Sequence, residues 1–187
     1  MKPEIFIQGK KIFLRALTHD DVTGPYLGWH NDEEVTRYMY RGWRPARVEE
    51  LEADYNRTIE SDKEIEFGVC DVETKKLIGV AGLHEIDWLT RQTEFRIMIG
   101  DKDFWGKGCG AETAKLLLEY AFEKLNLNRV GLGVNAEDPR AIKSYHNAGF
   151  VDEGVSRQVI FRNNKYYDAV RMSMLRSEYE AIKNGNA

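Results

Sequence analysis

The sequence predicts a single domain over residues 1–187, of α/β (α+β) class, in which helices flank a central mixed, mostly antiparallel sheet of about seven strands. Three observations support this prediction. A chain of 187 residues with 42% hydrophobic residues is long enough to bury one core. Segments with strand character follow one another through short connections, which favours antiparallel pairing. Helical segments interrupt them, giving the order strand, helices, three strands, helix, strand, helix and two strands.

The N-terminal third is predicted to contain one strand and three helical segments. The strand covers 11–17, and Thr18 to Asp21 then resembles a capping box with Asp21 in place of the usual glutamate. A helix should follow to about Trp29. Asp32 is expected to cap a second short helix. Pro45 suits the first turn of a third helix, which should end near Ile59.

The middle of the chain is rich in strand segments. Residues 64–70 and 77–86 are predicted strands joined by a turn at 71–75, and a third strand is predicted at 93–99. Their short connections again favour antiparallel neighbours.

The second half alternates helices and strands. The clearest helix is predicted at 111–125, where apolar residues at helical spacing form one face: Ala114, Leu117, Leu118, Ala121, Phe122 and Leu125. A strand at 129–134 and a short helix at 139–147, ending at Gly149, should follow. Two strands at 150–161 and 165–174 are predicted to form a hairpin that turns at Asn163-Asn164. A last helix is expected to start near Ser177.

Charge and cysteine content limit the classes of function. A net charge of −4 and a pI near 5.7 argue against nonspecific nucleic-acid binding, which requires a basic surface. This acidic balance suits a cationic acceptor such as an amine, and equally suits an ordinary solvated surface. Cys70 and Cys109 form no CxxC or Cys/His cluster, so we expect no metal site and a reducing, cytoplasmic location. No signal peptide or membrane span is expected.

A glycine-rich run, Trp105-Gly106-Lys107-Gly108-Cys109-Gly110-Ala111, joins the predicted strand at 93–99 to the helix at 111–125. The first N–H groups of a helix have no partner within it, and the helix dipole adds partial positive charge there. Glycines let the backbone approach an anion closely, and Lys107 adds charge. The run therefore predicts a phosphate-binding site.

Two common phosphate-binding loops do not fit this run. A Walker loop requires GxxxxGK followed by Ser or Thr, and the sequence has no such segment. A Rossmann loop requires GxGxxG after a first parallel strand, whereas Gly106, Gly108 and Gly110 form GxGxG after a strand in mid-chain. The acetyltransferase pattern Gln/Arg-x-x-Gly-x-Gly/Ala is matched by residues 105–110 at Gly108 and Gly110.

A second segment extends the match. A strand ending in Asn135 is followed by the pattern Ala-Ile-x-x-Tyr-x-x-x-Gly-Phe at 141–150. Together the segments resemble the GNAT superfamily, most closely the branch that contains the ribosomal-protein N-terminal, spermidine and amino-sugar acetyltransferases. The resemblance covers nearly the whole chain. Trp105 departs from the usual Gln or Arg, although Trp occurs in this branch.

The resemblance implies an N-acetyltransferase that uses acetyl-CoA. In this family the strand before the glycine-rich run and the strand that ends in Asn135 separate from each other, and the pantetheine arm of the donor enters between them. Asn135 is then expected to contact that arm, and Tyr145 to lie near the thioester sulfur. The residues assigned to donor binding are Met98, Ile99, Trp105, Gly106, Lys107, Gly108, Cys109, Gly110, Ala111, Asn135 and Ala141.

The expected chemistry is direct attack of an amine on the acetyl carbonyl, followed by expulsion of a thiolate. A phenol with a pKa of about 10 can protonate a thiolate whose conjugate acid has a pKa of about 8.5. This transfer is mildly uphill, but it stabilises the leaving group as charge develops, so Tyr145 is the expected general acid. A backbone N–H near Met98 or Ile99 is expected to stabilise the oxyanion. The alternative role for Tyr145 is that of a packed aromatic residue on an amphipathic helix.

An acceptor amine with a pKa of about 10 is mostly protonated at pH 7, so some group must accept its proton. Glu85 is the first candidate and Glu94 the second, because acceptor sites of the family often use a glutamate on one of these two strands. Either could equally be an ordinary surface carboxylate. Strand alternation predicts Glu85 and Asp87 on one face and His84 on the other, and His84 is assigned a structural role.

The acceptor itself stays open between a polyamine, an amino sugar and a protein N-terminus. Residues 85–96 resemble the spermidine acetyltransferases, whereas residues 29–39 also suit amino-sugar enzymes. Glu33 and Glu34 either attract a cationic acceptor or favour the dipole at a helix start. No nucleic-acid or membrane partner is expected, and dimers are common in this branch, so a homodimer is considered.

Two other hypotheses are retained. The chain could be a CoA-binding or sensory module without catalysis, although Tyr145 and the nearby carboxylates argue for an enzyme. Cys109 stands at a helix start, where the thiol pKa is lowered, and a nucleophilic cysteine would imply an acyl-enzyme. No His or Asp stands near it in the sequence and direct transfer requires no acyl-enzyme, so Cys109 is expected to be dispensable.

Overall fold

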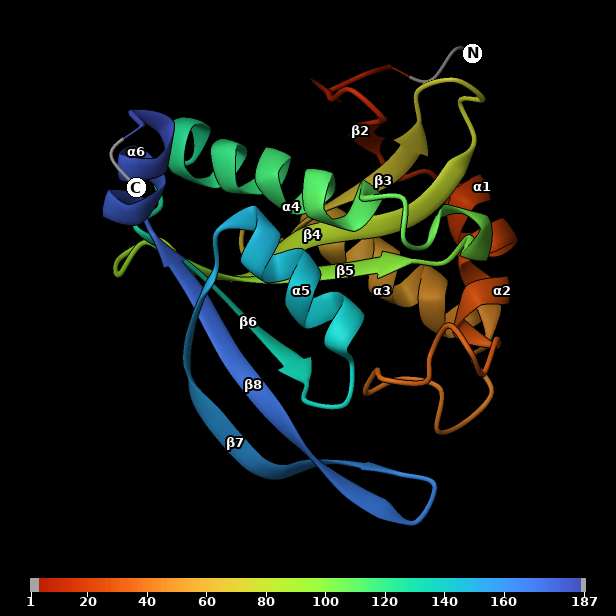
Figure 1. Cartoon of the computed structure of the whole chain (residues 1–187). Coiled ribbons are helices and arrows are strands. Elements are labelled where there is room, and N and C mark those ends of the chain that lie inside the picture. Colours follow the sequence, from red (N-terminus) through yellow and green to blue (C-terminus); the bar gives the residue numbers. More distant parts are fainter. Residues whose placement is uncertain (1–3, 186–187) are drawn as a thin grey trace.

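The computed structural model describes residues 4–185, which form an eight-stranded sheet with helices on both faces (Figure 1). The strand order is β1-β2-β3-β4-β5-β6-β8-β7. Among the described residues only β5 and β6 pair in parallel, and the other neighbouring strands are antiparallel. The strands are β1 (Ile7–Gln8), β2 (Ile12–Ala16), β3 (Ile65–Asp71), β4 (Leu77–Asp87), β5 (Gln92–Ile99), β6 (Arg129–Asn135), β7 (Val151–Arg162) and β8 (Lys165–Leu175).

The predicted fold class, a mixed and mostly antiparallel sheet flanked by helices, is confirmed. All seven predicted strands are present. The eighth strand, β1, was not predicted, because two residues are too few to show an alternating pattern.

The main core lies between the sheet and the two helices that follow β5 and β6. α4 (Cys109–Glu119) continues through one wide turn, η3 (Tyr120–Lys124), so that together they cover the predicted helix at 111–125. Its apolar face is fully buried at Leu117 and nearly so at Leu118 and Phe122. α5 (Pro139–Ala148) ends at Gly149, whose φ of 103° is the left-handed conformation that favours glycine at this position.

The opposite face of the sheet, which we call the α3 face, is covered by the N-terminal helices. These are α1 (His19–Asp21), η1 (Val22–Tyr26), α2 (Leu27–His30) and α3 (Val48–Glu60). The predicted capping box is present: the side chain of Thr18 accepts the N–H of Asp21, and Asp21 accepts the N–H of Thr18. The helix predicted to Trp29 is interrupted at Gly24, which has non-helical angles and precedes Pro25.

Two helical predictions in this region are wrong. Residues from Asp32 to about Met39 form turns. Asp32 does accept the N–H of Glu34 at 2.9 Å, as a helix cap would, and its carbonyl accepts the N–H of Thr36 at 3.0 Å, but this single turn is not continued into a helix. Pro45 does not lie in a first helical turn, since α3 starts only at Val48.

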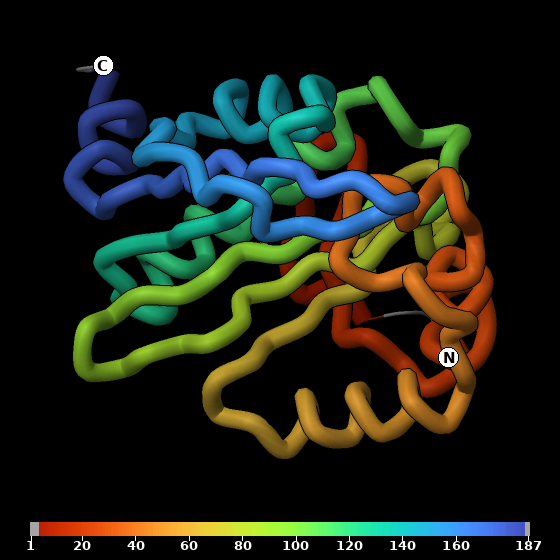
Figure 2. Tube along the Cα trace, turned by 90° about the horizontal axis from the view of Figure 1, so that it is seen from below, coloured from red at the N-terminus to blue at the C-terminus, as the bar shows by residue number. Residues whose placement is uncertain are grey.

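The C-terminal part forms a long hairpin and α6 (Arg176–Lys183), both as predicted. Asn163 and Asn164 have φ values of 47° and 58° and make its turn. The hairpin tip lies beside the loop at residues 31–44 (Figure 2). Arg162 of β7 fixes this contact by donating hydrogen bonds to the Arg41 carbonyl at 2.5 Å and to the Thr36 hydroxyl at 3.2 Å.

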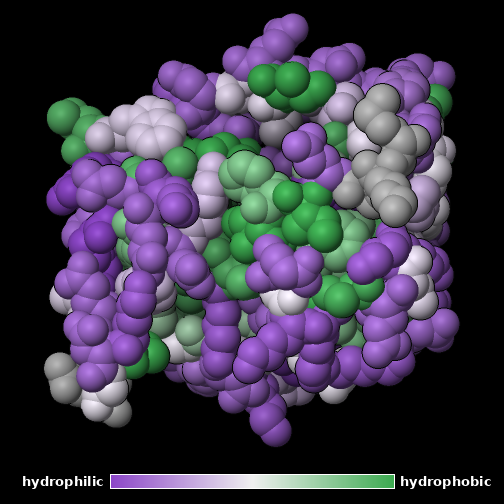
Figure 3. Space-filling model, turned by 90° about the horizontal axis from the view of Figure 1, so that it is seen from above, coloured by the Kyte–Doolittle hydropathy of each residue, from purple (hydrophilic) through white to green (hydrophobic). Residues whose placement is uncertain are grey.

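The surface mixes polar and apolar side chains in the usual way. Viewed from above, apolar side chains gather near the centre of one face and hydrophilic side chains surround them (Figure 3). Among residues 4–185, no helix has the length and apolar character required to span a membrane.

Candidate active site

The two parallel strands separate within the sheet. β5 and β6 pair at Gln92–Arg129, Thr93–Val130 and Glu94–Gly131, and share no pair beyond these. Their carboxyl ends diverge (Figure 1), and each leads toward the start of a helix, α4 after β5 and α5 after β6. Beyond Phe95, the edge of β5 therefore presents backbone groups without a partner strand.

The register decides which of these backbone groups face β6. The Gly100 N–H donates to the carbonyl of Ile78 on β4 at 3.0 Å. In an antiparallel pair every second residue directs its backbone groups toward the partner strand, so Met98, two residues earlier, also faces β4. The alternate residues, Ile97 and Ile99, direct theirs toward β6. Of the two expected oxyanion donors, Ile99 therefore has the suitable orientation, and Ile97 joins it. The sequence did not indicate Ile97, because the phase of the pairing is not visible in one strand.

The glycine-rich run forms an open cradle at the start of α4. Gly106 and Gly108 have φ values of 72° and 84°, and a Cβ at Gly106 would meet no atom within 4 Å. The first helical hydrogen bond runs from the Glu112 N–H to the Gly108 carbonyl, which leaves the N–H groups of residues 109–111 available to an anion.

Basic and aromatic side chains surround this cradle. Lys11 donates to the Lys107 carbonyl at 2.8 Å, and the Arg140 guanidinium lies 4.9 Å from the centre of the Trp105 ring. Trp105 also donates its indole N–H to the Ile99 carbonyl at 2.7 Å, which ties the run to the end of β5. The residues present therefore fit a ligand that carries phosphate groups, such as CoA.

Cys109 does not have the properties of a nucleophile. Its side chain is 3% exposed and belongs to the main core. Burial raises the pKa of the thiol, and the charges of Lys11 and Lys107 only partly oppose this. The expectation of a lowered pKa at this helix start is wrong, because desolvation of the thiolate outweighs the nearby positive charge.

Tyr145 lies on α5 above the point where the strands separate. Its ring contacts Phe95, the first residue of β5 beyond the last pair, edge-on at 6.1 Å between centroids, and Phe150 at 5.9 Å. Burial raises the pKa of its phenol, so Tyr145 stays protonated at neutral pH. The residue thus packs as an aromatic side chain and also carries a proton at the place where a general acid is expected.

Asn135 and Ala141 lie at the passage from β6 to α5. The buried Asn135 accepts the N–H of Glu137 at 2.9 Å through its side-chain oxygen, and among the described residues its amide nitrogen donates no hydrogen bond. Ala141 donates its N–H to Asp138, which caps α5. Asn135 therefore holds the turn and can also donate a hydrogen bond to a ligand between the strands.

Glu85 lies in an unexpected position. Its φ is 54°, and the register of β4 shifts between His84 and Asp87. This irregularity turns Glu85 toward Arg96, with which it forms an ion pair on the face that also carries His84. The predicted placement of Glu85 and His84 on opposite faces is therefore wrong. The Glu85 side chain is 69% exposed, which fits a surface ion pair.

Glu94 lies at the point of separation itself, because it is the last residue of β5 that pairs with β6. Its carboxylate accepts hydrogen bonds from both terminal nitrogens of Arg171, each at 3.1 Å. Only Gly131 lies beneath it on β6, where a Cβ would be 3.4 Å from a carboxylate oxygen.

The structure adds Glu66 and His84 to the α3 face. His84 Nε2 lies 3.5 Å from a Glu66 oxygen. Burial lowers the pKa of His84 to about 4, while burial and the charge of Glu64 raise the pKa of Glu66 to about 7. A glutamate within an otherwise largely apolar strand was the signal available in the sequence, and it was not singled out.

Glu33 and Glu34 do not start a helix, because this segment forms turns. Lys102, in the short turn η2 (Lys102–Phe104) that follows β5, contacts Asp32 at 2.8 Å and Glu34 at 3.0 Å. The Glu34 carboxylate thus already has a lysine partner.

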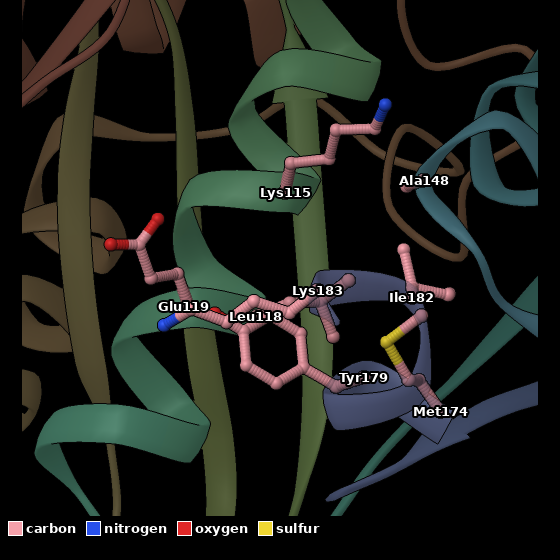
Figure 4. Close-up of a pocket in the computed structure, with 8 residues that line it drawn as sticks. All are labelled: Lys115, Leu118, Glu119, Ala148, Met174, Tyr179, Ile182 and Lys183. Carbon is pink, nitrogen blue, oxygen red and sulfur yellow. The ribbon is translucent and has the colours of Figure 1, made fainter. Parts of the chain in front are cut away.

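A separate hollow of about 310 Å³ lies between α4 and α6 (Figure 4). Leu118, Ala148 and Met174 contribute apolar atoms to it, and Lys115, Glu119 and Lys183 contribute charged side chains. It lies toward the end of α4 that is distant from the glycine-rich run. Within residues 4–185, no group of three His, Cys, Asp or Glu side chains is arranged to hold a metal ion.

These features are those of a transferase that binds a phosphate-bearing acyl donor. The two parallel strands diverge, a helix start lined with glycine follows, and a protonated phenol lies above the divergence. The family model for the acetyltransferase (GNAT) domain matches residues 11–151. The chain therefore belongs to the GNAT acetyltransferase family, and it transfers the acetyl group of acetyl-CoA to a primary amine.

Known relatives are similar over most of their length. The chain is 34% identical to a spermidine N(1)-acetyltransferase of Vibrio cholerae, over 90% of this chain and 95% of the relative. It is 36% identical to that of Escherichia coli, over 90% and 88%. The crystal structure of the Vibrio cholerae enzyme in complex with CoA and spermine has a TM-score of 0.83, at 34% identity over 92% of this chain and 99% of that chain.

Proposed function

We propose that the acceptor is a polyamine and that residues 1–187 act as one GNAT domain. The observation that carries this proposal is the set of carboxylates on the α3 face, on β3 to β5 beside the point where β5 leaves β6: Glu64, Glu66, Glu85 and Glu94. A polyamine is a chain of cationic groups, so carboxylates close to the reaction site favour it. Three of the four have an arginine partner, and Glu66 does not. The similarity to two spermidine acetyltransferases points the same way.

In this mechanism the residues of the chain have separate tasks. The helix start at residues 109–111 holds the phosphates of the donor, and the N–H groups of Ile97 and Ile99 donate to the acetyl oxygen as negative charge develops on it. The amine nitrogen bonds to the acetyl carbon while the carbon–sulfur bond breaks. Tyr145 gives its proton to the departing sulfur.

The amine must lose a proton in the same reaction. Glu94 is the better candidate to accept it, directly or through water, because it lies at the strand separation, whereas Glu85 is exposed and paired with Arg96. The bidentate contact with Arg171 would hold the Glu94 carboxylate in one orientation.

A protein N-terminus is the second candidate acceptor. The chain is 30% identical to a putative ribosomal N-acetyltransferase of Bacillus subtilis, over 82% of this chain and 84% of the relative. The proposal also includes a cytoplasmic location, because both cysteines are free and buried. It further includes a homodimer, which light scattering tests directly.

The test is steady release of free CoA from acetyl-CoA with spermidine, an amino sugar and an N-terminal peptide as acceptors. We expect spermidine to give the highest kcat/KM and a 42-dalton gain in product mass, the value of one acetyl group. Tyr145→Phe should lower kcat by about 100-fold or more with CoA affinity preserved, since general acid catalysis contributes about 10²–10⁴-fold. Tyr166→Phe, an exposed residue of the hairpin, serves as the control. No turnover of any polyamine by the unchanged enzyme would refute the proposed acceptor.

A further inference from the structure

The carboxylates on or beside the α3 face differ in whether a cation compensates them. Four have an arginine nitrogen within 4 Å: Asp54, Glu64, Glu85 and Glu94. Glu66 is the exception, because among residues 4–185 its carboxylate has no arginine or lysine nitrogen within that distance and its one nearby basic group is His84, at 3.5 Å.

His84 supplies no compensating charge at neutral pH. Burial and the neighbouring Arg96 lower its pKa to about 4, so the imidazole is neutral. The Glu66 side chain is only 18% exposed, and burial raises the pKa of its carboxyl to about 7. A half-buried carboxylate without a counter-ion is unfavourable unless a ligand supplies one, and such groups concentrate at functional sites.

The charged side chains around Glu66 do not supply a counter-ion for it. Arg41 forms an ion pair with Asp54 at 2.5 Å, and Arg57 lies between Asp54 and Glu64. Tyr26, whose phenol lies in the same region, has a pKa raised by burial and by the charge of Glu66, and so remains neutral. Glu66 is therefore left without a cationic partner among the described residues.

A glycine on β4 lies between Glu66 and β5, the strand that leaves β6. Glu66 on β3 lies opposite Gly82 on β4, which lies opposite Arg96 on β5. A Cβ at Gly82 would be 3.1 Å from Glu66 Cγ and 3.1 Å from His84 Nε2. Because strands lie about 4.8 Å apart, the Glu66 backbone is roughly 10 Å from that of β5. The residue directly between them, Gly82, has no side chain, and His84 lies beside it.

We propose that Glu66 binds the second, non-reacting ammonium group of a diamine or polyamine acceptor while the reacting amine lies where β5 leaves β6. An extended chain advances about 1.25 Å per bond, so a four-carbon diamine spans about 6 Å and spermidine about 11 Å. The reach of the glutamate side chain shortens the backbone distance by several ångströms, so both lengths fit. This inference rests on the proposed function, and it makes Glu66 a specificity residue: a monoamine or a single terminal amine has no group for it.

The test compares acceptors that differ only in the second amine. The kcat/KM for spermidine, 1,4-diaminobutane and n-butylamine is measured at saturating acetyl-CoA for the unchanged enzyme, Glu66→Gln, Glu66→Asp and the control Glu60→Gln, an exposed carboxylate at the end of α3. We expect Glu66→Gln to lower kcat/KM for the two polyvalent amines by 10- to 100-fold, mainly through KM, and to leave n-butylamine within 2-fold. Glu66→Asp should be intermediate, and Glu60→Gln should match the unchanged enzyme.

Other outcomes separate the two proposals. An unchanged enzyme that turns over no polyamine overturns the proposed acceptor. An unchanged enzyme that prefers diamines, together with Glu66→Gln that keeps the full preference, overturns the role of Glu66 alone. Equal losses for n-butylamine and 1,4-diaminobutane in Glu66→Gln would mean a structural role and would also overturn it. Calorimetric titration of spermidine into each variant without acetyl-CoA provides a readout that does not depend on turnover, and Glu66→Gln should weaken that binding by a similar factor.

Discussion

Glu94 accepts two parallel hydrogen bonds from Arg171, each 3.1 Å long, across a strand that carries glycine at both positions beneath the pair. A Cβ at Gly133 would come within 2.7 Å of an Arg171 nitrogen, so this side-chain arrangement requires glycine there. The pair bridges β5 and β8 over β6, next to the last point at which β5 and β6 are joined. It thereby fixes a carboxylate at the edge of the proposed reaction site.

If Glu94 and Arg171 act as one unit in catalysis, their substitutions should not be additive. We expect Glu94→Gln to lower kcat/KM for the amine by about 10²-fold, the range of one general base. Arg171→Gln should cost less, because the carboxylate remains but loses its fixed orientation. The double variant should be no worse than Glu94→Gln alone, and kcat/KM at saturating acetyl-CoA measures this.

Arg171→Lys is the matched comparison. A lysine keeps the charge but cannot form two parallel hydrogen bonds, so activity should lie between Arg171→Gln and the unchanged enzyme. Losses that multiply in the double variant would instead mean that the two side chains contribute independently.

Gly108 should control donor affinity through its backbone conformation. Its φ of 84° is unfavourable for any residue with a Cβ, at a cost of about 1–2 kcal/mol, and a shift to relieve that strain would displace the N–H groups that face the phosphates. We expect Gly108→Ala to weaken CoA binding by about 10-fold or more in calorimetry. Gly185→Ala, with φ of 71° near the end of the described chain, imposes similar strain away from the site and should leave CoA affinity unchanged.

Direct transfer predicts that the thiol of Cys109 is dispensable. The side chain is buried and the thiol pKa is raised, so Cys109→Ala should keep kcat within about 3-fold and lower stability by about 1 kcal/mol through lost packing. Stopped-assay kinetics and thermal unfolding measure the two effects. Near-total loss of turnover with normal CoA affinity would argue for an acyl-enzyme instead.

The sequence predicted the elements with strong local signals and missed those that depend on pairing between distant segments. The seven longer strands, the helix behind the glycine-rich run and the turn at Asn163-Asn164 all carry periodicity or turn chemistry of their own. The interruption at Gly24 and the turns after Asp32 were predicted as helix, because short amphipathic segments are ambiguous until side-chain caps and tertiary packing decide.

The candidate site shows the same division. The donor loop is one contiguous segment, so a pattern identifies it. The arrangement of carboxylates instead depends on how the strands pair. A local shift in the register of β4 turns Glu85 toward Arg96, and Glu94 is paired with Arg171, 77 positions later in the chain. Glu66 lies on β3, two strands away from β5, where the sheet divides. None of these relations is contained in the sequence of a single strand.

The pH dependence of stability should report the buried histidine of α2. His30 is 3% exposed, its Nε2 has no hydrogen-bond partner among the described residues, and its ring lies edge-on to Tyr26 at 4.5 Å. Burial lowers its pKa to about 4, with Arg41 adding to the effect and Asp54 opposing it. The unfolded chain, with a histidine pKa of about 6.5, then binds more protons than the native state between pH 6.5 and pH 4, so stability is lost as pH falls through this range.

His30→Phe should remove this part of the acid sensitivity while keeping the aromatic contact with Tyr26. Urea titrations at pH 7 and at pH 5 measure the free energy of unfolding of each protein. The decrease from pH 7 to pH 5 should be smaller in the variant than in the unchanged protein, by about 1–2 kcal/mol. As pH falls, protonation of His84, whose pKa is lowered, also destabilises the fold, whereas protonation of Glu66, whose pKa is raised, stabilises it. Both residues are present in the variant and in the unchanged protein, so their contributions cancel in the difference. Parallel pH profiles for His30→Phe and the unchanged protein would mean that His30 reaches solvent and titrates normally.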